Sequence, residues 1–221
     1  AHLGGSFSMI EILVFILEKV LKKNDKFILS KSHASYPFIL MLRQKGFKPK
    51  LTTHLEIDKK NGIHCTTGSL GHGFPISVGM ALAKKKMKKK GNIFVMISDG
   101  ECQEGTTWES SLIASKYKLD NLFLIIDYNK IQALTTLKEG LPLSNLKKKF
   151  NAFNFNTIEI KDGHNFTSIN KKFKLSKKNK PTVFIIHTIK GKGIKKFEND
   201  PVWHARKIEG RDIEIGNKSL K

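Results

Sequence analysis

Two oxygen-bearing side chains stand directly after two apolar runs in the middle of the sequence. Asp99-Gly100 follows a run that begins at Ile93, and Asn129 follows a run that begins at Leu122. A carboxylate and an amide oxygen are hard ligands that suit Mg²⁺ or Ca²⁺, which protein sites often share with substrate phosphates. Gly100 lets the backbone approach a phosphate closely, and a helix behind it would offer free N–H groups. The pattern predicts a metal–diphosphate site, although Asp99-Gly100 alone also fits an ordinary turn and Asn129 alone a helix cap.

The elements around these two residues must bring them together. Both runs are rich in Ile, Val and Phe, as in fully buried strands of a parallel sheet, and residues 107–117 between them are long enough for a crossover helix. Strand–helix–strand units are right-handed almost without exception, so both strands point the same way. Asp99 and Asn129 are therefore expected at the same carboxyl edge of the sheet, where open α/β folds bind their ligands.

The spacing and the surrounding residues resemble a known family. A Gly-Asp-Gly followed about thirty residues later by Asn is typical of thiamine-diphosphate enzymes, and segments 99–105 and 127–132 resemble transketolase in particular. Ser98 stands where the family has its first Gly, and Tyr128 stands where it often has Asn or Asp. Neither departure removes a metal-ligand type.

The resemblance implies a role for each residue of this central unit. Asp99 and Asn129 would bind Mg²⁺ (or Ca²⁺) through their side chains, and Ile131 would bind it through its carbonyl. Gly100 would donate a backbone N–H to the diphosphate. Glu104 would meet its symmetry mate or the partner in a proton relay, although it could equally be a charge at a helix N-terminus.

Further motifs of the same family follow in its order along the chain. They occupy segments 1–5, 30–34, 66–73, 162–164 and 190–204, with departures at Ala1, His72 and Ala205. The resemblance implies that Gly68 and Leu70 lie against the cofactor's ring system and that His33 and His204 assist in binding the diphosphate. The histidines that would line the entrance and hydrogen-bond the hydroxyl groups of the donor sugar are His2, His54 and His204. His64 matches nothing functional, and we expect it to be structural.

The alternation of strand-like and helix-like segments predicts the fold class: α/β, a three-layer sandwich with a mostly parallel central sheet, which the resemblance identifies as the thiamine-diphosphate-binding fold. Ser8 and Glu11 form a capping-box pattern that predicts a helix start, and Gly46 predicts a helix end. Further helices are predicted at 36–46, 75–90, 145–150 and 165–175, and further strands at 27–30, 155–160 and 181–187. After Arg206 the sequence is charged, and we expect a surface tail.

Length and composition limit the function classes. The 221 residues are ample for one domain, and we predict a single diphosphate-binding domain over residues 1–221. The net charge of +21 comes almost entirely from lysine. Proteins that read nucleic acids rely more on Arg, so we expect no nucleic-acid partner but an attraction for anionic sugars or cofactor. Cys65 and Cys102 are isolated and the run from Met9 to Val20 is short and interrupted by charges, so we expect a cytoplasmic protein without a membrane span.

The resemblance implies an enzyme that needs a partner. Transketolases transfer a two-carbon ketol unit from a ketose to an aldose, with thiamine diphosphate as the electron sink. The chain resembles only the diphosphate-binding domain, so we expect a C-terminal subunit to supply the pyrimidine-binding domain, in a heterotetramer of two of each. The substrates would be sugars or sugar phosphates. Two alternatives remain: a subunit of another thiamine-diphosphate enzyme, such as a deoxyxylulose-phosphate synthase, and a non-catalytic partner subunit.

Overall fold

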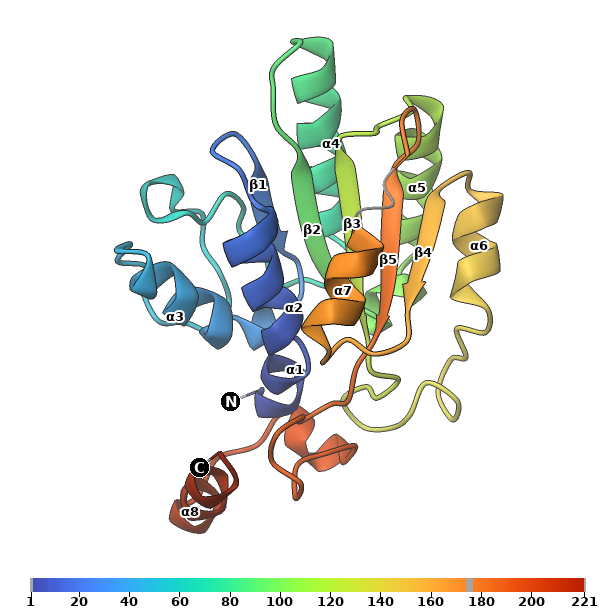
Figure 1. The fold of residues 1–221 in the computed structure, drawn as a ribbon. Helices are drawn as coiled ribbons and strands as arrows, with labels where there is room; N and C mark the ends of the chain where they lie inside the picture. The colour runs from blue at the N-terminus through green and yellow to red at the C-terminus, as the bar shows by residue number, and fades with distance from the viewer. Residues whose placement is uncertain (1, 174–176, 221) are drawn as a thin grey trace.

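A parallel β-sheet forms the centre of the molecule (Figure 1). The structure is a computed structural model that describes residues 2–173 and 177–220. Within these residues the strands are β1 (Lys26–Leu29), β2 (Ile93–Ser98), β3 (Leu122–Tyr128), β4 (Asn156–Ile160) and β5 (Thr182–His187). They lie in the order β1-β2-β3-β5-β4, and every neighbouring pair is parallel. The sheet is thus fully parallel, where the sequence predicted a mostly parallel one.

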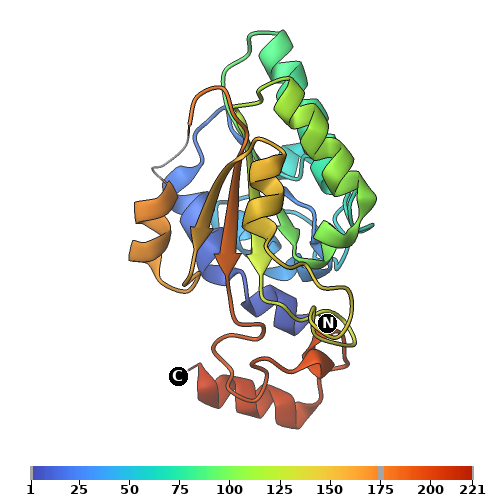
Figure 2. The same cartoon turned by 90° about the vertical axis from the view of Figure 1, so that its right-hand side faces the viewer.

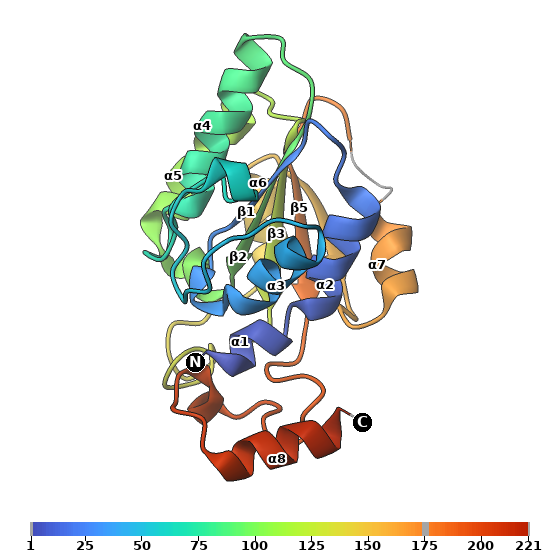
Figure 3. The same cartoon turned by 90° about the vertical axis from the view of Figure 1, so that its left-hand side faces the viewer.

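Two layers of helices cover the sheet, as Figures 2 and 3 show from opposite sides. One face is covered by α2 (Ile10–Phe15), α3 (Tyr36–Gln44) and α7 (Phe166–Phe173). The other is covered by α4 (Gly73–Lys86), α5 (Gly105–Lys116) and α6 (Leu146–Ala152). Successive strand residues point to opposite faces, so Phe94 packs with the first layer and Val95 with the second. The predicted three-layer α/β sandwich is confirmed.

Shorter helical segments lie mostly at the carboxyl edge of the sheet. They are α1 (Leu3–Phe7), η1 (Ile16–Val20), η2 (Ser32–Ala34), η3 (Lys59–Asn61), η4 (Gly100–Gln103), η5 (Pro201–His204) and α8 (Gly210–Ser219). The helices η2 and η4 follow β1 and β2 directly, and α1, η5 and α8 lie beyond the strand ends (Figure 1). None of the helices in the described ranges has the length and apolar character that a membrane crossing requires.

Strand register aligns the polar residues that follow the strands. Ser98 lies opposite Asp127, and Tyr128 lies opposite His187. The chain therefore leaves β2, β3 and β5 at one level, and the residues just beyond these strands share one edge, as the crossover argument predicts.

Local predictions at the two ends of the chain are wrong. Ser8 does not cap a helix: Met9 is the N-cap of α2, and the Ser8 hydroxyl donates instead to the Asp127 carboxylate at 2.6 Å. A buried carboxylate is a stronger acceptor than a local backbone group, so the long-range bond prevails. The region after Arg206 is not a tail but contains α8, whose capping box joins Glu209 and Asp212. Ile215 of this helix packs against the cluster around Trp203.

Helix boundaries differ in smaller ways. The helix predicted at 75–90 begins earlier, at Gly73, and ends at Lys86, because Lys88 adopts a positive φ of 51° that no α-helix continues through. The predicted end at Gly46 is confirmed, since α3 closes just before this left-handed glycine (φ +88°). The helix predicted at 165–175 is α7, and its last predicted residues, 174 and 175, lie outside the described part of the chain.

Candidate active site

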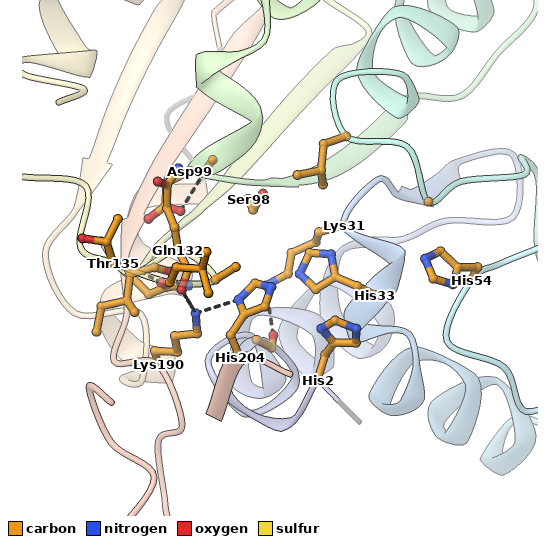
Figure 4. A pocket seen from close by; sticks show the side chains of 18 residues that line it. His2, Lys31, His33, His54, Ser98, Asp99, Gln132, Thr135, Lys190 and His204 are labelled. Atoms are coloured by element: carbon orange, nitrogen blue, oxygen red, sulfur yellow. Dashed lines mark hydrogen bonds between the residues drawn. The ribbon is translucent and has the colours of Figure 1, made fainter. Parts of the chain in front are cut away.

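A cavity of about 510 Å³ opens at the carboxyl edge of β1, β2 and β3 (Figure 4). Its walls combine segments that are far apart in the sequence. They include His2, Gly5, Lys31, His33, His54, Gly68, Leu70, Ser98, Asp99, Gly100, Asn129, Ile131, Gln132, Lys190 and His204. All cofactor, metal and substrate residues singled out from the sequence, apart from Glu104, line this one cavity.

Asp99 and Asn129 are both buried at its floor. Asp99 is 2% exposed; its carboxylate accepts the Gly100 N–H at 2.9 Å and the Lys130 N–H at 2.6 Å. Burial, and then the neighbouring Asp127 carboxylate, raise the pKa of Asp99 to about 7. The Asn129 Oδ1 accepts the Ile131 N–H at 3.1 Å. A buried carboxylate with a raised pKa is a group that a bound cation would stabilise.

A buried ion pair lies behind these residues. Lys31 and Asp127 are 1% and 0% exposed, and the Lys31 ammonium donates to the Asp127 carboxylate and, at 2.9 Å, to the Gly5 carbonyl. Ser8 and Thr188 also donate to Asp127. Burial alone would raise the pKa of Asp127, but Lys31 and these hydrogen bonds hold it below its usual range. The carboxylate thus joins the first helices to the ends of β1, β3 and β5.

A second buried lysine occupies the other side of the cavity. The Lys190 ammonium donates to the Ile131 carbonyl at 2.9 Å, to the Gln132 carbonyl at 2.8 Å and to His204 Nδ1 at 2.8 Å (Figure 4). Burial, and then Lys31, lower the pKa of Lys190 to about 8. An ammonium can only donate, so Nδ1 of His204 accepts and the ring keeps its proton on Nε2.

Three histidine rings pack edge to edge and face to face at the entrance. The ring centroids of His2, His33 and His204 lie 5.2, 5.3 and 5.4 Å apart in pairs. Burial, followed by the charge of Lys31, lowers the pKa of His33 to about 2, and burial followed by Lys190 lowers that of His204 to about 4. These two rings are neutral at pH 7 and can donate or accept one hydrogen bond at each nitrogen.

The glycine-rich loop forms the wall opposite Asn129. A Cβ on Gly68 would lie 2.6 Å from the His54 ring, and Gly71 adopts a left-handed φ of +77°. Gly68 and Leu70 face the cavity. The absence of side chains at the two glycines therefore brings backbone and His54 close to the space that a flat ring would occupy.

The sequence predictions divide into those the geometry brings together and those it does not. His2, His33, His54, His204 and the Asp99–Asn129 pair converge, as predicted from the strand ends and the motif order. Glu104 is exposed and lies outside the cavity lining, so its relay role stays a prediction. The Gly100 N–H is engaged by Asp99 rather than turned to the cavity. His64 lies away from the cavity lining, next to Lys26.

Sequence reasoning missed Lys31 and Lys190. Both stand inside motifs already noted, but nothing in a single sequence indicates that a lysine is buried. A signal was present for Lys31, because it directly follows a predicted strand at the ligand-binding edge. The two buried ammonium groups make the cavity suited to a polyanion.

The residues of the cavity fit both a divalent metal and a diphosphate. Asp99, Asn129 and the Ile131 carbonyl offer three oxygen donor types that suit Mg²⁺, and a cation, the Lys190 ammonium, already contacts the Ile131 carbonyl. In the described part of the chain no group of three or more His, Cys, Asp or Glu side chains could hold a metal ion, so such a site would depend on this mixed oxygen set.

Comparison with known proteins agrees with the geometry. The family "Transketolase, thiamine diphosphate binding domain" matches residues 2–220. One of the two subunits of an apulose-4-phosphate transketolase from Actinobacillus succinogenes is 34% identical over 100% of this chain and 87% of its own length. A 6-deoxy-6-sulfo-D-fructose transketolase subunit from Clostridium sp. is 34% identical over 94% of this chain and 83% of its own length.

Longer transketolases match over only part of their length. Mouse transketolase is 34% identical over 84% of this chain, which spans 31% of the mouse protein. The structure of Leishmania mexicana transketolase superposes with a TM-score of 0.91 at 23% identity, over 99% of this chain and 38% of that one. The fold is therefore shared with one part of a longer enzyme.

Proposed function

Because this chain belongs to the transketolase family, thiamine diphosphate binding domain, we propose that it is the N-terminal subunit of a split transketolase. The observation that carries the proposal is the convergence of Asp99, Asn129 and Ile131 on one buried cavity beside two buried lysines. With a partner chain, the enzyme transfers a two-carbon ketol unit from a ketose to an aldose.

The cavity divides into three regions of different chemistry. Asp99, Asn129 and the Ile131 carbonyl would hold Mg²⁺, which neutralises part of the diphosphate. Thiamine diphosphate, when bound, supplies the carbanion and electron sink for ketol transfer. His33, His204 and Lys190 would donate hydrogen bonds to the diphosphate.

The ring and the substrate would lie further out. Gly68 and Leu70 would lie against the cofactor's rings, and His2, His54 and His204 would hydrogen-bond substrate hydroxyl groups. Neutral imidazoles suit this task because each can both donate and accept. The Glu104 side chain reaches the surface, where only a partner chain could complete a proton relay.

A partner surface is visible beside the cavity. The neighbouring helices α4 and α5 expose Ile76, Leu112 and Ile113 by 43%, 61% and 46%, and residues 73–83 contain no charged side chain in a protein of net charge +21. Depletion of charge around exposed apolar residues is typical of interface cores. We infer that a C-terminal subunit with the pyrimidine-binding domain covers this face, in a heterotetramer of two chains of each kind.

Substrates and location follow from weaker support. Two relatives are named for apulose-4-phosphate and 6-deoxy-6-sulfo-D-fructose, which are anionic sugars, and the buried lysines of this cavity favour anions. We therefore propose sugars or sugar phosphates as substrates. The free, buried Cys65 and Cys102 support a cytoplasmic location.

Reconstitution tests the proposal. The chain is mixed with the partner polypeptide from the same source, thiamine diphosphate and Mg²⁺, and transfer of a ¹³C-labelled two-carbon unit from a ketose to an aldose is followed by mass spectrometry. Transfer that requires both chains is the expected result. Binding of the partner without cofactor binding or transfer would show a non-catalytic subunit instead.

A further inference from the structure

Glu101 is a fully buried carboxylate that lines no part of the cavity. It lies two positions after Asp99 and is 0% exposed. Its Oε1 accepts the Ser30 hydroxyl at 2.5 Å and the Gly71 N–H at 3.1 Å, and its Oε2 accepts the Ser98 N–H at 2.9 Å. One side chain therefore connects the ends of β1 and β2 with the glycine-rich loop.

The loop is held from both sides of Gly71. The Thr106 hydroxyl donates to the Gly71 carbonyl at 2.7 Å while Glu101 accepts its N–H. A Cβ on Gly73 would lie 2.3 Å from the Ser30 Oγ, so only glycine at 73 leaves Ser30 in place to reach Glu101. The loop position thus depends on contacts with the segment that directly follows Asp99.

The metal side of the cavity has restraints of its own. Asp99 is fixed by the Gly100 and Lys130 N–H groups, and its own N–H donates to the Asp127 carbonyl at 3.3 Å. Gly68 and Leu70, by contrast, belong to the loop that Glu101 holds. Loss of Glu101 should therefore disturb the ring side of the cavity more than the diphosphate side.

We propose that Glu101 is a positioning residue that sets the ring-binding half of the cavity by fixing the glycine-rich loop at Gly71. The inference rests on the proposed function, since it assigns the loop to the cofactor's rings. Glu101 touches neither cofactor nor substrate; it acts through Gly71 and Ser30. Buried residues behind a binding group typically change affinity about 10- to 100-fold when altered.

Glu101→Gln tests the proposal because it preserves shape but not acceptors. A carboxylate accepts at both oxygens, whereas an amide turns its NH₂ toward one of the three donors and leaves that donor unpaired. Thr106→Val is a milder second variant that removes the other bond to Gly71. Asp212→Asn is the matched control, because Asp212 is a buried carboxylate (5% exposed) in α8, away from the cavity.

Calorimetric titrations with two probes separate the halves of the cavity. Each variant is titrated, in the presence of Mg²⁺, with thiamine diphosphate and with inorganic pyrophosphate. We expect Glu101→Gln to weaken thiamine diphosphate by about 10- to 100-fold, with pyrophosphate close to wild type. Thr106→Val should change the ratio of the two affinities in the same direction, and Asp212→Asn should leave it unaltered.

Two results would overturn the inference while leaving the proposed function intact. One is unchanged thiamine diphosphate affinity in folded Glu101→Gln and Thr106→Val proteins. The other is an equal loss for both probes, which would mean that Glu101 supports the whole site or the fold. A wild-type chain that binds neither probe would contradict the proposed function itself, and the inference would fall with it.

Discussion

Replacing Lys31 by Met should destabilise the protein strongly, because it leaves the Asp127 carboxylate buried without its cation. The two side chains are 1% and 0% exposed, so water cannot replace the lost partner. Removing one member of a buried pair typically costs about 3–5 kcal/mol. Asp127 keeps donors from Ser8 and Thr188, so we expect a loss of about 3 kcal/mol in the free energy of unfolding.

Urea denaturation followed by circular dichroism measures this loss. The matched control is Lys45→Met, which breaks the exposed pair with Glu18, whose side chains are 35% and 45% exposed. Such surface pairs contribute about 0–1 kcal/mol. The double variant Lys31→Met/Asp127→Asn should recover part of the loss, because the amide carries no charge. If Lys31→Met costs no more than Lys45→Met, the buried pair does not stabilise the site as its burial implies.

Two further predictions concern the loop and the histidines. Gly71→Ala should lower stability by about 1–3 kcal/mol, because its φ of +77° disfavours a side chain and the new Cβ would lie 2.7 Å from Glu104 Cβ and Thr106 Oγ1; a thermal midpoint equal to wild type would contradict this. Stability should also fall as pH drops below about 6.5, because unfolded histidines bind protons there while burial, followed by nearby cations, holds the pKa of His33 to about 2 and of His204 to about 4 in the fold. Each such histidine contributes a slope of up to about 1.4 kcal/mol per pH unit in that range, and His33→Asn should flatten the measured profile of unfolding free energy against pH; an unchanged profile would mean that His33 is protonated in the fold.

The parts of the site that the sequence predicts are those governed by local rules. Asp99 and Asn129 follow buried strands, and one right-handed crossover suffices to bring them to a shared edge. The histidines were found because their motifs occur in a family's order. None of this requires knowledge of how distant side chains pack.

The parts that the sequence does not predict depend on long-range contacts. Ser8 has the pattern of a helix cap, but its hydroxyl bonds to Asp127 far along the chain. Lys31 and Lys190 are ordinary residues in a lysine-rich sequence until the fold buries them. The helix α8 was missed because its N-cap is Glu209, a residue type that rarely occupies this position.

Asp99 is central to the proposed function, in which it helps to hold a divalent cation that binds a diphosphate. The most direct measurement is the affinity of the chain for thiamine diphosphate, with and without Mg²⁺, in the wild type, in Asp99→Ala and in the control Asp58→Ala, which alters only the cap of η3. Mg²⁺-dependent binding that Asp99→Ala abolishes and Asp58→Ala retains, in proteins with unchanged circular dichroism, is the predicted result. Equal affinity in folded Asp99→Ala and wild-type protein would contradict it.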